Sequence, residues 1–305
     1  MSTPAPKLLL LGCTGQVGWE LARSLQPLGQ VLALDRSRAD FDSPAALETL
    51  VRNEAPAAVI NAAAYTAVDQ AETDSVRAHR INGESPGALA RAARDVGALL
   101  IHYSTDYVFP GGGSSRWRPA DPVSPVNAYG QTKLAGERAI DAEGGDWLVF
   151  RTSWVYAARG RNFLLTMLRL GAERESLRVV ADQIGAPTSA RLIADATAQA
   201  VRQAFDARRR GHFTSEVHHL CAAGETSWHG FSQAIFERWR AIAPGSPLAV
   251  KSVEPIASSS YPTPARRPLN SRLDCTEFES RFGIVLPPWQ AGLDLVLAEV
   301  ASQRA

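Results

Sequence analysis

The stretch Leu8-Leu9-Leu10-Leu11-Gly12-Cys13-Thr14-Gly15-Gln16-Val17-Gly18 decides the fold of this chain. A continuous apolar run, typical of a strand buried on both faces, leads into three glycines and then into a segment of helical periodicity. Glycines let the backbone turn sharply and approach a pyrophosphate, whose charge then meets the free amide groups at a helix N-terminus. The spacing G-x-x-G-x-x-G therefore predicts a dinucleotide-binding turn, with a plain strand-to-helix turn as the alternative.

Outward from this turn, the N-terminal half alternates short apolar runs with helical segments. The runs expected to be buried parallel strands are Leu8–Leu11, Val31–Leu34, Ala58–Ile60, Ala98–Tyr103 and Trp147–Phe150. The segments with helical periodicity between them are Trp19–Leu28, Pro44–Asn53 and Pro86–Val96. This rhythm predicts an α/β fold, a Rossmann-type doubly wound parallel sheet with its ligand at the carboxyl ends of the strands.

The C-terminal half has a mixed pattern, with expected helices at Phe163–Leu170 and Ala190–Ala207 and an expected strand at Leu177–Ala181. The Pro-rich run Tyr261–Pro268 cannot form regular secondary structure, so it must cross a surface or enter a cleft. We expect residues 1–154 to form mainly an NAD(P)-binding domain. Residues 155–305 should form mainly a smaller, mixed α/β substrate-binding lobe, with some segments returning to the first domain.

The bulk properties exclude several classes of protein. A formal net charge of +1 gives no reason to expect a nucleic-acid or membrane partner. No apolar run approaches the roughly 20 residues of a membrane span, and the N-terminal residues lack the regions of a signal peptide. The three cysteines are widely spaced, so neither a disulfide framework nor a zinc site is indicated. We therefore expect a cytoplasmic enzyme.

Two further motifs bear on chemistry. Ser104-Thr105-Asp106-Tyr107 closes an apolar run, and Tyr129-Gly130-Gln131-Thr132-Lys133 places a tyrosine and a lysine four residues apart, on one face of a helix. A ketone that is reduced by hydride needs a proton on its developing oxyanion. The Lys133 ammonium should move the pKa of Tyr129, which is near 10 for a free tyrosine, toward working pH. Thr105 would hydrogen-bond the substrate carbonyl.

Two neighbouring residues favour different cofactors, NAD and NADP. Asp35 ends the second predicted strand about 20 residues after the glycines, where an acid accepts from a ribose 2′-hydroxyl and favours NAD. Arg36 follows at once, and an arginine there pairs with the 2′-phosphate of NADP, so both NADPH and NADH remain open. The residues expected to contact the cofactor are Gly12, Gly15, Gln16, Val17, Gly18, Asp35, Arg36, Asp40, Phe41, Ala62, Ala63, Ala64, Tyr65, Tyr129 and Lys133.

These motifs, with Asn61-Ala62-Ala63-Ala64 and Arg151-Thr152-Ser153-Trp154-Val155-Tyr156, resemble the extended short-chain dehydrogenase/reductases. Within them the chain resembles the dTDP-4-dehydrorhamnose reductase family, through Asp182–Thr188 as well. The resemblance implies reduction of the C4 ketone of dTDP-4-dehydro-β-L-rhamnose by NADPH or NADH, the last step of dTDP-L-rhamnose synthesis. It also implies that Thr105, Tyr129 and Lys133 are catalytic and that Trp154 packs against the sugar.

A dTDP-sugar carries a diphosphate, which Arg266 or Arg267 on the Pro-rich run could bind bidentately; a structural salt bridge is the alternative for one of them. Asp106, Asn162 and Gln183 are further candidates for substrate contacts. His218 and His219 are adjacent in an expected strand, so their side chains diverge and a shared metal is not expected.

One departure from the family concerns Mg²⁺, which some bacterial members hold through acidic residues at a subunit contact. One of those residues follows the Gly-Ala-Pro-Thr segment, where this chain has Ser189-Ala190-Arg191. A cation beside Arg191 is disfavoured electrostatically. No metal ligand is therefore assigned, and both a monomer and a homodimer remain open.

Two other functions share these motifs. An epimerase or dehydratase of nucleotide sugars would use the same fold, and a dehydratase needs an acid beside the threonine. Asp106 is adjacent to Thr105, but on a strand its side chain would point away. A non-catalytic relative, the regulatory β subunit of methionine adenosyltransferase, resembles the family too. The retained Thr105, Tyr129 and Lys133 argue for an active enzyme.

Overall fold

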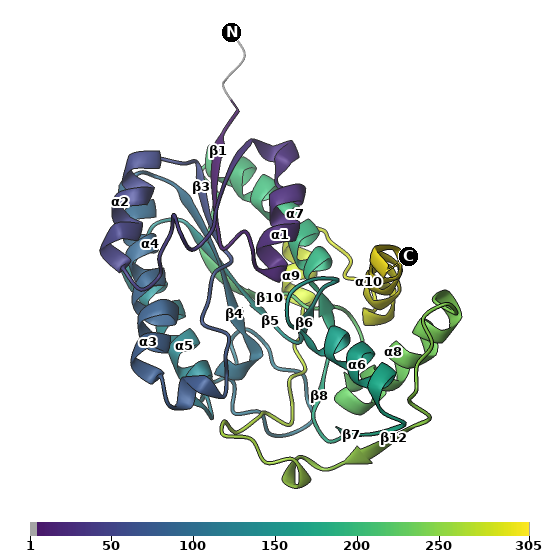
Figure 1. Ribbon diagram of the computed structural model, residues 1–305. Helices are drawn as coiled ribbons and strands as arrows, with labels where there is room; N and C mark the ends of the chain where they lie inside the picture. Colours follow the sequence, from purple (N-terminus) through teal and green to yellow (C-terminus); the bar gives the residue numbers. More distant parts are fainter. Residues whose placement is uncertain (1–4, 305) are drawn as a thin grey trace.

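A six-stranded parallel sheet forms the centre of the computed structural model, which describes residues 5–304 (Figure 1). Its strand order is β10-β5-β4-β3-β1-β2, and each neighbouring pair runs parallel. The strands are β1 (Lys7–Leu11), β2 (Gln30–Leu34), β3 (Ala58–Asn61), β4 (Leu99–Thr105), β5 (Trp147–Thr152) and β10 (Glu216–His219). The predicted Rossmann-type sheet is confirmed, and its strand order reverses between β1 and β3, where such folds bind their ligands.

Helices cover both faces of the sheet and build the second lobe. They are α1 (Gln16–Ser24), α2 (Pro44–Glu54), α3 (Ser75–His79), α4 (Ser85–Asp95), α5 (Ala128–Glu143), α6 (Phe163–Glu173), α7 (Ala190–Arg209), α8 (Trp228–Ile242), α9 (Thr276–Phe282) and α10 (Trp289–Arg304). Of the helices among residues 5–304, none is long and apolar enough to cross a membrane.

The observed helix α1 differs at both ends from the predicted segment Trp19–Leu28. Helix α1 begins at Gln16, directly after the glycine turn, and ends at Ser24. Pro27 lies in the following short turn, Gln26–Leu28, and a proline cannot donate to the α-helical ladder. The periodic pattern read beyond Ser24 therefore belongs to a separate 3₁₀ turn.

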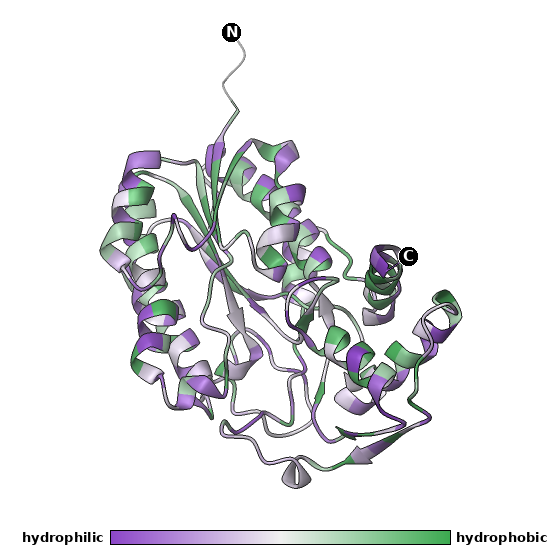
Figure 2. Cartoon of the chain, in the orientation of Figure 1, coloured by the Kyte–Doolittle hydropathy of each residue, from purple (hydrophilic) through white to green (hydrophobic). Residues whose placement is uncertain are grey.

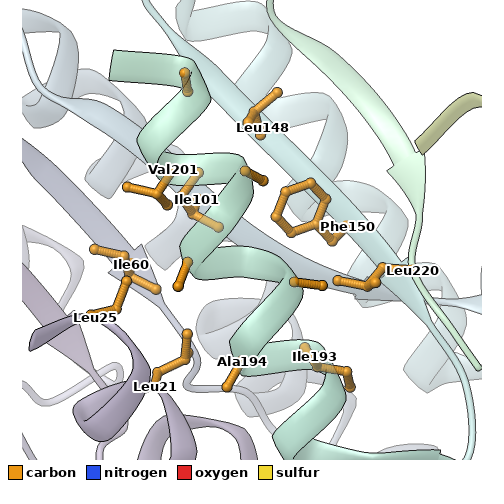
Figure 3. Close-up of a cluster of buried hydrophobic side chains, with 14 of the residues drawn as sticks. Leu21, Leu25, Ile60, Ile101, Leu148, Phe150, Ile193, Ala194, Val201 and Leu220 are labelled. Atoms are coloured by element: carbon orange, nitrogen blue, oxygen red, sulfur yellow. The ribbon is translucent and has the colours of Figure 1, made fainter. Parts of the chain in front are cut away.

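Alternation along β1 builds the two cores on either side of the sheet. Leu8 and Leu10 pack with α1, α7 and α9 in one cluster, which Figure 3 shows around α7. Leu9 and Leu11 pack on the opposite face with α2, α4 and α5. Such two-sided burial explains why the strand is a continuous apolar run. In Figure 2 the strands are largely green, and the purple, hydrophilic residues lie mainly on helices and loops.

The second lobe has its own apolar cluster, which α6, α8 and α10 enclose (Figure 1). Short strand pairs edge this lobe: β12 (Ser252–Ile256) with β7 (Ser176–Val180), β11 (Thr226–Ser227) with β8 (Ile184–Gly185), and β6 (Val155–Tyr156) with β9 (Thr188–Ser189). Three segments from the C-terminal half, β10, α7 and α9, lie against the Rossmann sheet instead. Strand β10 pairs with β5, and α7 packs on α1.

Candidate active site

The predicted dinucleotide turn lies at the carboxyl end of β1, beside the point where the strand order reverses. Gly12 has a φ of +79°, and a Cβ there would lie 2.8 Å from the nitrogen of Ala63. A Cβ on Gly18 would lie 2.1 Å from the oxygen of Gly12. Only glycine fits at these two positions, so the turn is tight and α1 begins at the edge of the site.

A cavity of about 560 Å³ opens from this turn along the carboxyl ends of the strands. This volume lies within the usual range of small-molecule sites, roughly 300–1,000 Å³. Its lining includes most of the expected cofactor residues together with the tyrosine–lysine pair: Gly12, Gly15, Gln16, Val17, Arg36, Asp40, Phe41, Ala62, Ala63, Ala64, Tyr129 and Lys133. The cradle therefore suits a dinucleotide, with the reacting end beside α5.

Three expected cofactor residues do not line the cavity. Gly18 packs beneath the turn against Gly12. The Tyr65 hydroxyl donates to Asp74 at 3.1 Å. The Asp35 carboxylate accepts from the hydroxyl and the N–H of Ser37, which lowers its pKa. These side chains are engaged within the protein.

Arg36 lines the cavity just after β2 and forms an ion pair with Asp42, with 2.9 Å between Nη2 and Oδ2. The exposed fraction of its side chain is 71%, so the guanidinium is open to a ligand. At the end of β2 the arginine is thus better placed than Asp35 to meet a group on the adenosine ribose.

Tyr129 and Lys133 line one wall of the cavity, and Thr105 lies beside Tyr129. Thr105 ends β4, while Tyr129 and Lys133 lie one turn apart on α5. The Thr105 side chain lies close enough to the Tyr129 phenol to oppose the rise of its pKa. Thr105 and Lys133 are buried, and Tyr129 is half-buried where it faces the cavity. The sequence-predicted catalytic set is one spatial cluster.

The start of α5 is fixed by two local features. The Oδ1 of Asn127 accepts from the N–H of Gly130 at 2.8 Å, which caps the helix. A Cβ on Gly130 would lie 2.2 Å from the carbonyl oxygen of Tyr107, so only glycine lets α5 approach the segment after β4 so closely. This close approach brings Tyr129 to Thr105.

Burial governs the acid–base behaviour of the tyrosine and the lysine. Desolvation, followed by the charge of Asp106, raises the pKa of Tyr129, and the hydrogen bond with Thr105 opposes the rise. Desolvation also lowers the pKa of Lys133 to about 8, against the opposing charge of Glu137. The expected shift of Tyr129 toward neutral pH is wrong for the protein alone, because desolvation of the phenolate dominates. Tyr129 is a neutral phenol that can donate a proton.

The expectation that the Asp106 side chain points away from Thr105 is also wrong. Asp106 begins a 3₁₀ turn, Asp106–Val108, instead of continuing β4, so its side chain does not point away from Thr105. The hydroxyl of Thr105 donates to Oδ1 of Asp106 at 3.1 Å. Burial raises the pKa of Asp106 to about 7, although hydrogen bonds with Ser271 and Thr105 oppose the rise. An acid that holds its proton near neutral pH therefore stands beside the catalytic threonine.

Behind Lys133 lies a buried polar chain that sequence reasoning missed. The Nζ of Lys133 lies 3.1 Å from Nε2 of His102, and it donates to the carbonyl oxygen of Tyr103 at 2.7 Å. The Nδ1 of His102 lies 3.0 Å from Nδ2 of Asn61. The one available signal was a histidine inside an apolar strand, in register with Asn61 on the neighbouring strand.

Trp154 follows β5 with a φ of +48°, which is uncommon outside glycine. Its ring stacks on Trp228, with 3.6 Å between the ring centroids. The Nε1 of Trp228 donates to Oε1 of Gln183, and Nε2 of Gln183 donates to Ser258. Gln183 thus connects the aromatic pair to the segment that precedes the Pro-rich run.

A second cavity, of about 470 Å³, runs along the Pro-rich segment. It is lined by Pro110–Gly112, Gln183, Ser258, Ser259 and Tyr261–Leu269. The Pro-rich segment is irregular, as predicted, and it borders a cleft. Its backbone is tied to α5 because Nδ2 of Asn127 donates to the carbonyl oxygen of Arg266 at 2.8 Å.

The two neighbouring arginines of this segment differ. Arg267 forms an ion pair with Asp69, with 2.7 Å between Nη2 and Oδ2. Arg266 is exposed, lines the second cavity and has no ion-pair partner within residues 5–304. Of the two, Arg266 has its guanidinium available for an anionic ligand.

Asn162 is fully engaged within the protein. Its Oδ1 caps α6 by accepting from the N–H of Leu165 at 3.0 Å. Its Nδ2 donates to Oε1 of Gln16 and to the carbonyl oxygens of Ala157 and Arg159. The side chain therefore ties the glycine turn to the second lobe and has no spare donor for a sugar.

The segment compared with the magnesium-binding relatives holds a cation of its own. The guanidinium of Arg191 pairs with Glu20 at 3.2 Å and with Glu299 at 2.6 Å. A divalent cation does not fit between these groups. Across the part of the chain that the structure describes, no cluster of three or more His, Cys, Asp or Glu residues could hold a metal ion.

The adjacent histidines diverge, as expected for neighbours on a strand. The ring of His218 packs on Phe282, with 5.2 Å between centroids, and the ring of His219 packs on Phe109 at 5.5 Å. They lie on opposite faces of β10.

Comparisons with known proteins agree with this geometry. Residues 6–302 match the family described as RmlD substrate binding domain. The chain is 55% identical over 297 residues to a dTDP-4-dehydrorhamnose reductase of Burkholderia thailandensis, covering 97% of this chain and all of that protein. It is 47% identical over 302 residues to the enzyme of that name from Escherichia coli K12, covering 98% of this chain and 99% of that protein.

A solved structure is similar along nearly the whole fold. The dTDP-4-dehydrorhamnose reductase of Bacillus anthracis, in complex with NADP, has a TM-score of 0.85 and 30% identity, covering 96% of this chain and 99% of that one. Its counterpart from Clostridium acetobutylicum has a TM-score of 0.86 and 34% identity, with the same two coverages.

Proposed function

The chain belongs to the RmlD substrate binding domain family, and from this premise we propose that it is a dTDP-4-dehydrorhamnose reductase. It reduces the C4 ketone of dTDP-4-dehydro-β-L-rhamnose to dTDP-L-rhamnose with NADPH or NADH, the last step of dTDP-L-rhamnose synthesis. One observation carries the proposal: Tyr129 and Lys133 line the cavity that begins at the glycine turn, and Thr105 lies beside Tyr129.

The residues of the cavity have distinct tasks in this reaction. A reduced nicotinamide, when bound, supplies the hydride. Tyr129, whose pKa burial raises, holds its proton at neutral pH and delivers it to the C4 oxygen. Thr105 turns its hydroxyl from Asp106 to the same oxygen and orients the ketone. Lys133 lies one turn along α5 and can donate to the hydroxyls of the nicotinamide ribose.

Separate arginines bind the cofactor and the sugar nucleotide. Arg36, on the cavity wall, favours NADPH because it can pair with a 2′-phosphate. Arg266, which has no ion-pair partner within the described residues, binds the diphosphate of the dTDP-sugar. Trp154, stacked on Trp228, packs against the sugar. In this division of labour, residues 1–154 mainly bind the cofactor and residues 155–305 mainly bind the substrate.

A nucleotide-sugar dehydratase is the second candidate, and one observation favours it. Asp106 lies next to Thr105 with a pKa of about 7, so it could protonate a leaving hydroxyl. The reductase remains preferred because the relatives that match nearly the whole chain carry that name.

The free thiols and the ion pairs of Arg191 bear on two further points. Cys221 and Cys275 are both free, with 3.5 Å between their sulfur atoms, which suits the reducing cytoplasm. Glu20 and Glu299 are already paired with Arg191, and Glu20 with Arg23 as well, so we expect a reaction that needs no Mg²⁺. The enzyme acts as a monomer or a homodimer.

The test is NADPH oxidation by the purified protein with dTDP-4-dehydro-β-L-rhamnose, with and without EDTA. Rapid oxidation that yields dTDP-L-rhamnose and is insensitive to EDTA is expected. Binding of NADPH without oxidation would overturn the assignment and favour another nucleotide-sugar substrate or a regulatory binding protein. Conversion of a dTDP-hexose to its 4-keto-6-deoxy product would favour the dehydratase.

A further inference from the structure

His102 lies in the centre of a buried hydrogen-bonded chain that ends at Lys133. Asn61 is the last residue of β3, and His102 is its register partner on β4. Both residues are 1% exposed, so no water competes for their polar atoms. Every donor in such a place must meet an acceptor, which makes the direction of each hydrogen bond deducible.

The direction is fixed at the Asn61 end. The backbone N–H of Ala63 donates to a side-chain oxygen of Asn61 at 3.0 Å. The amide nitrogen of Asn61 therefore faces Nδ1 of His102 at 3.0 Å, and it must be the donor in that contact. Nδ1 is then the unprotonated nitrogen of the ring, and the single ring proton sits on Nε2.

The proton on Nε2 has consequences for Lys133. Nε2 lies 3.1 Å from Nζ, so an N–H there needs a lone pair on the lysine nitrogen. A neutral amine offers that lone pair and still donates to the carbonyl oxygen of Tyr103 at 2.7 Å. An ammonium has no lone pair, so it would face a second donor.

The alternatives each leave a buried donor–donor contact. Protonation of Nδ1 instead of Nε2 would satisfy an ammonium but would set the ring N–H against the Asn61 amide. Rotation of that amide would relieve this contact but would set its NH₂ group against the N–H of Ala63. A doubly protonated ring conflicts with both neighbours.

We propose that His102 is a positioning residue that holds the Lys133 amine uncharged, as a hydrogen-bond acceptor, until a cofactor binds. The cofactor part of this inference rests on the proposed function, whereas the proton arrangement does not. Ribose hydroxyls and a developing tyrosinate then supply the acceptors that an ammonium needs. On cofactor binding the Lys133 amine takes up a proton from solvent and turns from His102 toward the cofactor. The ammonium can then return that proton to a Tyr129 that has given up its own.

The other groups around Lys133 agree with an uncharged amine. Glu137, on α5, is the carboxylate that favours the charged lysine, but it is bound at 2.7 Å by Arg151 of β5. Tyr129, also on α5, is a neutral phenol because burial raises its pKa. Desolvation lowers the pKa of Lys133 to about 8 and holds the pKa of His102 well below its usual range.

The chain offers an unusually direct test, because it contains only three lysines, Lys7, Lys133 and Lys251. NMR of protein labelled with ¹³C and ¹⁵N in lysine and histidine, recorded without cofactor, resolves both halves of the inference. Lys133→Met and His102→Phe assign the two signals. The expected result is an Nε2–H tautomer for His102 and a Lys133 pKa below the usual lysine value of about 10.4. An Nδ1–H tautomer, or a Lys133 pKa at or above that usual value, would overturn the proposal.

A variant that reverses the direction of the hydrogen bonds from Asn61 to Lys133 gives a second test. In Asn61→Asp, the carboxylate accepts from Nδ1, so His102 should change to the Nδ1–H tautomer and the pKa of Lys133 should rise. An unchanged tautomer in a folded Asn61→Asp protein would contradict the inference. The wild-type spectra decide the matter even if this variant does not fold.

Activity adds a third readout, with His218→Phe as the matched control. His218 is another buried histidine, but it packs among phenylalanines on β10, away from the cavity. His102→Phe should lower kcat by roughly 10-fold to 100-fold, as a misplaced catalytic group does, and leave the KM for the sugar nearly unchanged. Equal losses in the two variants would reduce His102 to a packing role. If neither the wild type nor the variants reduce the ketone, the proposed reaction fails while the NMR result stands.

Discussion

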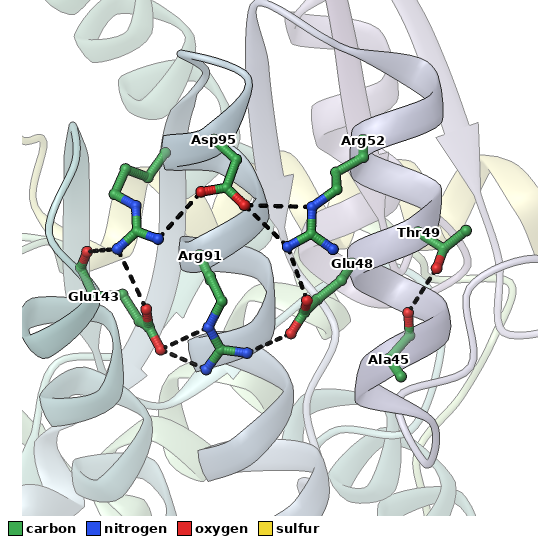
Figure 4. Close-up of polar contacts among 8 residues, drawn as sticks. Ala45, Glu48, Thr49, Arg52, Arg91, Asp95 and Glu143 are labelled. Atoms are coloured by element: carbon green, nitrogen blue, oxygen red, sulfur yellow. Dashed lines mark hydrogen bonds and ion pairs between the residues drawn. The ribbon is translucent and has the colours of Figure 1, made fainter.

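Helix α5 carries two polar clusters that differ in their exposure to water. On the outer side, Glu143 joins Arg91, Arg52, Glu48 and Asp95 in a network of ion pairs with α2 and α4 (Figure 4). The exposed fraction is 43% for Arg91 and 21% for Glu143. Each charge has several partners, so the loss of any one is tolerated.

On the inner side of the same helix, polar side chains are buried and have few partners. Lys133 meets His102 and a carbonyl oxygen, and Glu137 pairs with Arg151, where both side chains are 6% exposed. On the outer side the hydrogen bond with Glu143 raises the pKa of Arg91, whereas burial on the inner side lowers the pKa of Lys133 to about 8. Burial, and not the number of charged groups, therefore shifts the pKa values on the side of α5 that faces the site.

The largest effect is expected from Tyr129→Phe, which removes a single oxygen from the inner side of α5. The kcat for ketone reduction should fall by about 10²–10⁴-fold, because the proton donor is lost, while NADPH affinity stays nearly unchanged. Stopped-flow oxidation of NADPH and fluorescence titration measure the two quantities. Tyr156→Phe, which removes a buried hydroxyl of the second lobe, is the control and should keep its kcat. A fully active Tyr129→Phe enzyme would contradict the mechanism.

Glu137→Gln breaks the buried ion pair and leaves the guanidinium of Arg151 without its carboxylate. We expect a loss of about 3–5 kcal/mol in the free energy of unfolding, measured with urea. The double variant Glu137→Met, Arg151→Met should be more stable than the single one, since no buried charge is left over. A single variant as stable as the wild type would show that this pair is solvated.

Asp106→Asn tests the raised pKa beside Thr105. The pKa of Asp106 is about 7 in the folded protein, above the usual value near 3.9, so its stabilising contribution is full below pH 4 and is lost as the pH rises toward 7. Between pH 4 and pH 8 the stability difference should move in favour of the variant, by up to about 4 kcal/mol.

Urea unfolding at the two pH values measures this shift. Asp274→Asn is the matched control, because a hydrogen bond with Thr276 lowers the pKa of Asp274 and its dependence should have the opposite sign. A parallel dependence in the two variants would refute the assignment.

The smallest effect is expected on the outer side. Glu143→Gln should cost at most about 1 kcal/mol in the free energy of unfolding, and less at high salt, because exposed ion pairs are screened and weak. Thermal unfolding at low and high ionic strength measures the change. A loss as large as that of Glu137→Gln would erase the contrast between the two sides of α5.

The fold could be predicted because its strands are buried on both faces and read as continuous apolar runs, as in Leu8–Leu11. Tyr129 and Lys133 could be predicted because helical periodicity alone places them on one face. The direction of Asp106 could not, since it depends on where β4 ends and a 3₁₀ turn begins.

Long-range partners were also beyond local patterns. The stacking of Trp154 on Trp228 joins residues from different elements, and the ion pair of Arg267 depends on Asp69 nearly 200 residues away. His102 gave a weak signal, a polar residue in a buried strand, but its meaning required Asn61 and Lys133 in three dimensions.

The most direct test of the central claim follows the hydride itself. NADPH that carries deuterium at the transferred position should be mixed with the protein and dTDP-4-dehydro-β-L-rhamnose, and the sugar product examined by NMR. The expected product is dTDP-L-rhamnose with deuterium at C4. Deuterium at another carbon, or a product without deuterium, would contradict the proposed reaction.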